Sequence, residues 1–234
     1  MIKKNIQPRK VAFFDIDGTI FRSSLIVHIT DELINRGLFP ADAKNEFKLA
    51  HTKWLERRAD YEAYIGAVVR AFMTHIKGVA YTDFLLVCRY VSSIHKDRTY
   101  KHTRELMANL KSKGYYLLAV SQSPKTILDL VCPGYGFNKV YGRIYELGPG
   151  DKFTGKFLDE HLIANKANII KRAVEKEGLT LKGSIGVGDT EDDIPMLELA
   201  SKAIAFNPNK KLYKYAKRLG WEIVVERKDV VYKW

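Results

Sequence analysis

Apolar and polar positions follow two different patterns along the chain. The segment from Val11 to Asp15 is a short, continuous apolar run that ends at acidic residues, which is typical of a buried strand. From about Leu25 to Ile94, apolar residues recur at helical spacing, with breaks at residues 37–40 and 78–79. This second stretch is aromatic and poor in strand patterns. It therefore predicts a helical subdomain of about four helices.

After Asp97 the pattern alternates between helices and strands. Helices are predicted over residues 98–113, 124–130, 164–176, 192–199 and 210–219, and strands over 115–120, 140–145, 153–157, 184–187, 203–206 and 221–225. Such alternation is typical of a parallel sheet with helices on both faces. The sequence thus predicts an α/β fold, a Rossmann-like doubly wound parallel sheet built from residues 1–24 and 95–234. Residues 25–94 would form a helical cap inserted in this core.

The composition is 46% hydrophobic and 28% charged, as in ordinary soluble globular proteins. No run of 18 uncharged apolar residues occurs, so no membrane span is expected. The apolar run after the basic first ten residues is too short for a signal peptide. Cys88 and Cys132 have no paired spacing, which favours a reducing compartment. A cytoplasmic location is the resulting expectation.

The net charge of +12 is concentrated at the two ends of the chain. Residues 1–10 carry four basic groups and no acidic one, and residues 202–234 carry nine basic and three acidic groups. One interpretation is attraction of a phosphorylated substrate, RNA or a membrane surface. The other, a solvated surface, is favoured because basic and aromatic residues do not interleave as in a nucleic-acid module. No nucleic-acid partner is expected, and the oligomeric state stays open.

Polar residues follow three of the predicted strands. Asp15 and Asp17 end the first strand, Ser121 ends the second, and Asp189 follows the strand at 184–187. In open α/β sheets, ligands bind beyond the carboxyl ends of the strands. The pattern therefore predicts one shared site at this edge of the sheet.

Asp15 and Asp17 are the first candidates for chemistry. Residues two apart in an extended segment point to the same side, and two close carboxylates repel unless a cation or a proton intervenes. A hard dication such as Mg²⁺ suits these oxygen ligands. Gly18 permits a tight backbone and Thr19 offers a hydroxyl. A turn or helix cap built from Asp and Gly is the alternative.

The other candidates are weaker when taken singly. Asp189 precedes a predicted helix and is a candidate metal ligand, whereas Asp192 is better explained as a helix cap. Ser121 precedes a helix start, where a hydroxyl and free N–H groups can bind an anion, although an ordinary capping serine is equally consistent. Lys166 opens a helix, and on its own a solvated lysine is the favoured interpretation.

Together these residues supply a nucleophile, ligands for a dication, a hydroxyl and a cation, which a phosphoryl-transfer site needs. In this combination the chain resembles the haloacid dehalogenase superfamily, within its phosphoserine phosphatase-like branch. The pattern of that family is D-x-D-G-[TS], then Ser or Thr, then Lys, then G-D-x-x-x-D. The matching residues are Asp15-Ile16-Asp17-Gly18-Thr19, Ser121, Lys166 and Gly188-Asp189-Thr190-Glu191-Asp192-Asp193. The resemblance spans nearly the whole chain.

The resemblance implies a magnesium-dependent phosphatase that acts on a small phosphorylated metabolite. Asp15 would attack phosphorus and form an aspartyl-phosphate, and Asp17 would act as acid and then as base. Mg²⁺ would be held by Asp15, Asp189 and the backbone carbonyl of Asp17.

The remaining roles follow from the same resemblance. Ser121, the adjacent Gln122 and Lys166 would contact the phosphate. Asp193 would orient Lys166 or a metal-bound water, and Thr19 would support the metal ligands. The cap at residues 25–94 would close over the site and select the substrate.

Departures from the branch weaken phosphoserine as the substrate. Ser24 stands where phosphoserine phosphatases carry an acidic residue that contacts the substrate amine. Gln122-Ser123-Pro124 replaces a Gly-Gly pair, and Asp192 replaces Asn. Six cap residues could meet a leaving group, although packing or solvation is favoured for each: Trp54, Arg57, Arg58, Tyr61, Tyr64 and Arg70. A phosphotransferase, or a nucleic-acid or membrane-binding protein on the same fold, are the alternative functions.

Overall fold

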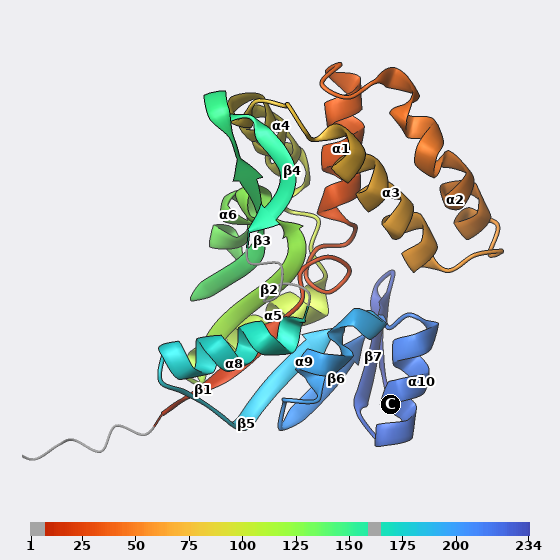
Figure 1. Ribbon diagram of the computed structural model, residues 1–234. Coiled ribbons are helices and arrows are strands. Elements are labelled where there is room, and N and C mark those ends of the chain that lie inside the picture. Colours follow the sequence, from red (N-terminus) through yellow and green to blue (C-terminus); the bar gives the residue numbers. More distant parts are fainter. Residues whose placement is uncertain (1–7, 159–164) are drawn as a thin grey trace, which may run out of the picture.

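A single eight-stranded sheet runs through the molecule, with strand order β4-β3-β2-β1-β5-β6-β7-β8 (Figure 1). The computed structural model describes residues 8–158 and 165–234. The six central strands pair in parallel, while β4 and β8 pair antiparallel at the two edges. The strands are β1 (Arg9–Phe14), β2 (Tyr116–Pro124), β3 (Lys139–Leu147), β4 (Phe153–Leu158), β5 (Leu179–Gly188), β6 (Lys202–Phe206), β7 (Glu222–Arg227) and β8 (Val230–Lys233). The predicted α/β fold is confirmed.

Helices cover both faces of the sheet, as a doubly wound fold requires. Alternate residues of β1 point to opposite faces. Ala12 and Phe14 share a hydrophobic cluster with α5 (Lys101–Ser112) and α6 (Lys125–Val131). Val11 and Phe13 share another with α8 (Lys166–Lys176), α9 (Ile194–Leu197) and α10 (Lys210–Leu219). The central strand is therefore buried on both sides, which fixes the position of the residues that follow it.

Residues 25–95 form the four expected α-helices and one short 3₁₀ helix, η1 (Ala41–Lys44). The helices are α1 (Leu25–Asn35), α2 (Asn45–Leu55), α3 (Tyr61–His75) and α4 (Tyr81–His95). Figure 1 shows α1, α2 and α3 standing together at the upper right, above β7 and α10, with α4 beside β4. Phe72 and Phe84 belong to the same hydrophobic cluster as Phe14 of the sheet, so the apolar core is continuous between the two parts. The division into core and cap stays a prediction.

The structure differs from the predicted elements mainly at the edges of the sheet. The predicted strand at 153–157 is β4, and it runs antiparallel to β3 because a tight turn with the 3₁₀ helix η3 (Pro149–Asp151) leaves no room for a crossover. The strand β8 was not predicted; all four of its residues are exposed, so no buried pattern marks it. β5 begins five residues earlier than expected, at Leu179.

Helix boundaries differ as well. The predicted helix at 192–199 is a 3₁₀ turn, η4 (Glu191–Asp193), followed by the four-residue α9, and a further 3₁₀ turn, η2 (Cys132–Tyr135), follows α6. The helix predicted to begin at residue 98 begins at Lys101, and Pro124 ends β2 instead of opening α6. The predicted helix start at residue 164 lies outside the described residues. Within the described ranges, no helix is long and apolar enough to cross a bilayer.

Candidate active site

The loop after β1 carries the first two predicted site residues against the end of β5. The backbone N–H of Asp15 donates to the carbonyl of Val187 at 3.0 Å, which ties the two strand ends together. Gly18 has φ +82°, and a Cβ at this position would lie 2.0 Å from Oδ2 of Asp189. Thr19 Oγ1 donates to Oδ1 of the same Asp189 at 3.2 Å. The glycine therefore permits the close approach that brings Asp189 beside the Asp15 loop.

Lys166 joins this group from the first turn of α8. The Asn165 side chain accepts from the N–H of Ala167 at 2.9 Å, which caps the helix and starts it at Lys166. Lys166 Nζ donates to Asp15 Oδ1 and to Asp193 Oδ1, both at 2.6 Å. Burial alone would lower the pKa of Lys166, but the two carboxylates raise the pKa above its usual range. The lysine therefore stays charged between two acids.

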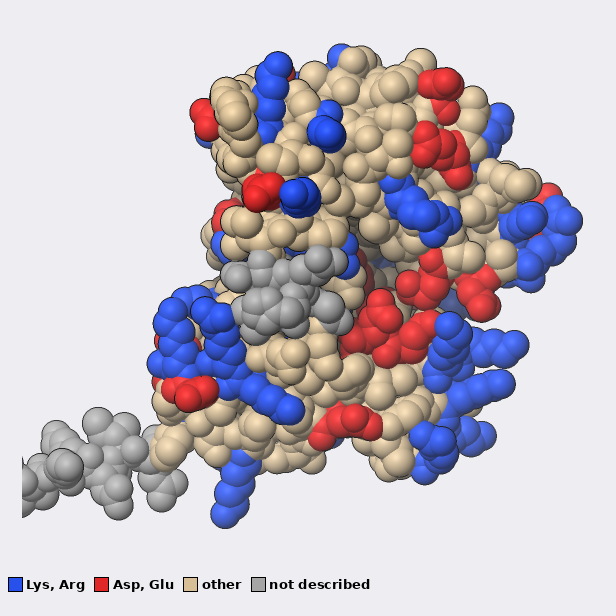
Figure 2. Space-filling model, viewed as in Figure 1, with Lys and Arg blue, Asp and Glu red and all other residues tan. Residues whose placement is uncertain are grey.

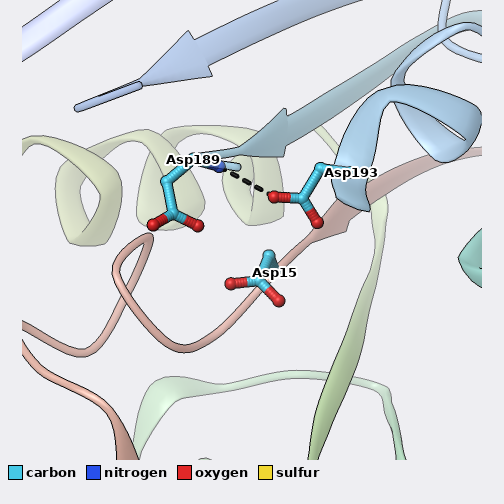
Figure 3. A group of neighbouring side chains, drawn as sticks. All are labelled: Asp15, Asp189 and Asp193. Carbon is cyan, nitrogen blue, oxygen red and sulfur yellow. Dashed lines mark hydrogen bonds between the residues drawn. The ribbon is translucent and has the colours of Figure 1, made fainter. Parts of the chain in front are cut away.

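Asp193 holds Lys166 and the loop after β5 in place through hydrogen bonds. Its Oδ2 accepts the N–H groups of Asp189 at 2.9 Å and of Thr190 at 3.1 Å. The first of these bonds is the dashed line in Figure 3, where Asp193 approaches from the turn that follows β5. With Lys166 on Oδ1, both oxygens are engaged. Asp193 thus fixes the lysine and the β5 loop in one arrangement.

Asp15, Asp189 and Asp193 form a possible cation site. One carboxylate oxygen from each lies within 4.8 Å of the others, and Figure 3 shows Asp15 and Asp189 converging on the same space. Because both oxygens of Asp193 are engaged, Asp15 and Asp189 are the better ligands. Burial, with further charge from neighbouring acids and opposition from Lys166, raises the pKa of Asp15 to about 8. Burial and Asp15 raise the pKa of Asp189 well above its usual range. Carboxylates are hard oxygen ligands, and a hard dication would offset the cost of burying two of them close together.

Asp17 lines the same cavity as Asp15 and is held by three donors. Its Oδ1 accepts the N–H of Leu25 at 2.6 Å, and its Oδ2 accepts the hydroxyls of Ser121 at 2.9 Å and Ser123 at 2.8 Å. Burial raises the pKa of Asp17, while these hydrogen bonds oppose the shift. A raised pKa shifts the carboxyl group toward its protonated form, which is the direction that a general acid requires.

Ser123 was missed in the sequence. The signal was available, because Ser121 and Ser123 are two apart at the end of β2 and so point to the same side. Ser121 is buried and accepts the N–H of Ser123 at 2.9 Å while donating to Asp17. The structure thus brings Ser121 to Asp17, and its predicted contact with phosphate stays a prediction. Gln122 Oε1 accepts from Arg143 Nη2 at 2.6 Å.

These groups surround a cavity of about 250 Å³. We call four charged residues the floor: Asp15, Asp17 and Asp189, which follow β1 and β5, and Lys166 from the first turn of α8. We call the residues that face them from α1 and α3 the roof: Ile26, Tyr61, Glu62, Ile65, Gly66 and Val69. The remaining lining residues are Ser24, Gln122, Ser123, Arg143, Tyr145, Thr190 and Asp192. The loops after β1 and β5 and the first turn of α8 therefore supply the charged floor, and α1 and α3 supply a largely apolar wall.

The roof differs from the predicted cap candidates. Of the six cap residues named from the sequence, Tyr61 lines the cavity. Trp54 instead packs against Tyr61 and Tyr64, with ring centroids 5.1 and 5.6 Å apart, in line with the packing interpretation. Arg143 and Tyr145 were not identified from the sequence, because they lie within β3 and not in a polar segment that follows the strand.

The mouth of the cavity is acidic although the chain is basic. Burial, reinforced by the charges of Asp192 and Glu191, raises the pKa of Glu62 to about 7. Figure 2 shows acidic side chains gathered where the helices above meet the sheet region below, with lysines and arginines gathered over α10. The residues on α10 are Lys210, Lys211, Lys214, Lys217 and Arg218. Positive charge therefore lies beside the entrance and negative charge at its rim.

Comparison with known proteins identifies the family. The profile of the haloacid dehalogenase-like hydrolases matches residues 12–198. The chain belongs to this family. The match runs from β1 through α9 and so contains all four floor residues.

Individual relatives place the chain in the phosphoserine phosphatase-like branch of the family. It is 28% identical over 214 residues to "Phosphoserine phosphatase SerB1" of Mycobacterium tuberculosis (strain H37Rv), covering 91% of this chain and 69% of that one. It is 23% identical over 227 residues to the histidinol-phosphatase of Neisseria meningitidis serogroup C, covering 92% and 98%. A phospho-aspartyl intermediate analogue of phosphoserine phosphatase has the same fold, with TM-score 0.65, 22% identity, and 95% and 96% of the chains covered. The protein is a phosphatase of this family.

Proposed function

We propose that this phosphatase hydrolyses a small phosphate monoester with the help of Mg²⁺, through an aspartyl-phosphate on Asp15. The observation that carries the proposal is the position of Asp15, on the cavity floor between the ammonium of Lys166 and the carboxylate of Asp189. The buried lysine keeps its charge where a phosphate would enter. A nucleophile in this setting splits one difficult displacement into two easier ones.

Asp15, Asp189 and the backbone carbonyl of Asp17 would hold the Mg²⁺. The residues present support this assignment. A Cβ at position 18 would collide with Asp189, so glycine keeps the space beside this carboxylate open. Burial disfavours the charged forms of Asp15 and Asp189, which a bound cation would stabilise. When bound, the cation would neutralise charge on the phosphate and on both carboxylates.

In the proposed reaction Asp15 is the nucleophile, and Asp17 is the general acid and then the general base. A carboxylate oxygen of Asp15 attacks phosphorus, and the bond from phosphorus to the leaving oxygen breaks. Asp17 gives its proton to that oxygen, then takes a proton from the water that attacks the phospho-aspartate. Phosphate and free Asp15 result. The raised pKa of Asp17 supports the first of these proton transfers.

The size of the cavity limits the substrate. About 250 Å³ lies below the range of ~300–1,000 Å³ typical of pockets for drug-sized ligands, which favours a small ester. Ser24 lines the cavity with a hydroxyl and not with a carboxylate, which argues against phosphoserine. The relatives are named for two different phosphate esters, so their names alone leave the leaving group open.

Release of phosphate from p-nitrophenyl phosphate tests the proposal. The wild type should show activity that is lost with EDTA and restored by Mg²⁺, and Asp15→Asn should lower kcat by roughly 10⁴-fold or more. Asp129→Asn is the matched control, because Asp129 is an exposed carboxylate paired with Lys125 on α6. Equal rates for the wild type and Asp15→Asn would show that Asp15 is not the nucleophile.

A further inference from the structure

Gly66 is an unexpected residue for its place in the fold. It lies in the interior of α3, a regular helix of 15 residues, and not at a left-handed turn. Glycine is the least favourable residue except proline inside a helix, because it loses the most conformational freedom on folding. A glycine here weakens the helix, so some other requirement must explain it.

Packing within the protein does not supply that requirement. A Cβ at position 66 would have one neighbour within 4 Å, the Nη1 atom of Arg70 at 3.4 Å, which is the end of a flexible side chain. At Gly18, by contrast, a Cβ would meet Asp189 at 2.0 Å, and at Gly188 it would meet Asp193 at 2.5 Å. Nothing in the described parts of the fold therefore excludes a side chain at position 66.

What position 66 does face is the cavity. Gly66 lines the roof between Ile65 and Val69, opposite the floor, and Ile26 of α1 continues the same apolar wall. A side chain at position 66 would take up room that a leaving group otherwise occupies. Apolar walls gain free energy by covering apolar surface, so the group that fits here has an apolar body.

We propose that Gly66 is a specificity-determining residue, whose bare backbone makes room for the wide, apolar body of the leaving group of the phosphate ester. This inference rests on the proposed function, because it concerns the same cavity and the same reaction. In this proposal α3 selects the leaving group by its width, while the floor binds the phosphate group that all substrates share.

The test compares a wide and a compact ester in Gly66→Ala and Gly66→Ser. For 1-naphthyl phosphate, kcat/KM should fall about tenfold or more, mainly through KM, because an added methyl overpacks an occupied site. For ethyl phosphate, kcat/KM should stay within about twofold. Gly66→Ala should also raise the Tm by about 2–4 °C, since alanine favours the helix. The similar volumes of Ala and Ser should give similar losses.

Ala63→Gly is the matched control, because Ala63 is exposed on the same helix and does not line the cavity. It should lower the Tm and leave the ratio of the two kcat/KM values unchanged. Equal losses for both esters in Gly66→Ala, or a wild type that accepts only ethyl phosphate, would each overturn the inference and leave the proposed function intact. Absence of Asp15-dependent turnover of both esters would overturn both.

Discussion

The floor and the roof of the cavity are built on different principles. Each floor residue is held by hydrogen bonds: Lys166 binds two carboxylates, and Asp17 accepts three donors. The roof consists mainly of apolar side chains on α1 and α3, whose positions come from packing. Bonds fix directions and distances, whereas packing fixes mainly volume. Changes in the floor should therefore affect rate, and changes in the roof should affect selectivity.

The floor and the roof are also carried by different elements of the fold. Asp15 and Asp189 follow β1 and β5, neighbouring strands in the middle of the sheet. Helix α3 packs on α1 and α2, beyond the sheet. A displacement of Asp15 or Asp189 would have to move the central strands, whereas α3, which carries five of the six roof residues, packs mainly on other helices. The following changes test this contrast, beginning with the largest effect.

Of the four changes considered next, Lys166→Met should have the largest effect, because it removes the only floor cation and leaves the buried carboxylates of Asp15 and Asp193 without their partner. We expect kcat to fall by roughly 10³-fold or more and the free energy of unfolding to fall by about 3 kcal/mol. Phosphate release and urea unfolding measure the two effects. Lys125→Met, which breaks an exposed pair on α6, should change neither by much. Nearly normal activity in Lys166→Met would show that the floor does not need this charge.

Gly18→Ala should come next. The new Cβ would collide with Asp189, and a misplacement of about 1 Å at a reacting centre can cost about 100-fold in rate. Gly37→Ala provides a control with a similar backbone, since Gly37 has φ +70° and no atom within 4 Å of a Cβ. Both variants should lose stability through backbone strain, but activity should fall only in Gly18→Ala. Parallel losses of activity would mean that strain, and not contact with Asp189, explains the glycine.

Ser123→Ala should have a smaller effect on the same floor. It removes one of three donors to Asp17, and a hydrogen bond to a charged group contributes about 1.5–3 kcal/mol. We expect kcat to fall by roughly tenfold or more while KM changes little. Ser112→Ala serves as the control, because the Ser112 hydroxyl bonds a carbonyl on the exposed side of α5. A change in KM alone would assign Ser123 to substrate binding.

The floor could be predicted from the sequence to a greater extent than the roof. Asp15 and Asp189 follow strands that are continuous apolar runs, and the carboxyl ends of such strands meet at one edge. That reasoning led to the correct neighbourhood before any family was considered. The roles of the individual residues stay predictions, because a distance between groups does not measure a rate.

The roof could not be predicted because helical periodicity does not identify a cavity. In α3, Val68 and Phe72 are buried in the core, while Ile65 and Val69 line the cavity, and all four are apolar. Only the three-dimensional arrangement separates these two faces. The same limit applies to β8, whose four exposed residues carry no pattern of burial.

Glu62 couples the roof to the region of the floor by charge, because the acids Asp192 and Glu191, which follow β5, act on this roof carboxylate. Burial and those acids raise its pKa to about 7, from 4.5. Below about pH 4.5 both the folded and the unfolded chain hold the proton, so Glu62 has no effect on stability. As the pH rises to about 7, the unfolded chain releases the proton first, and stability is lost. Glu62 is partly exposed, so we expect this loss to be about 1 kcal/mol after solvent screening.

Glu62→Gln should abolish that loss and be the smallest of the four effects. Thermal unfolding of the two proteins at pH 4.5 and pH 8 measures it: the Tm of the variant should exceed that of the wild type at pH 8 and match it at pH 4.5. Glu105→Gln on α5 is the control, because Glu105 is an exposed carboxylate whose pair with Lys101, at 3.8 Å, lies on the surface. A Tm difference that is the same at both pH values would mean that Glu62 acts through packing, and that roof and floor are not coupled by charge.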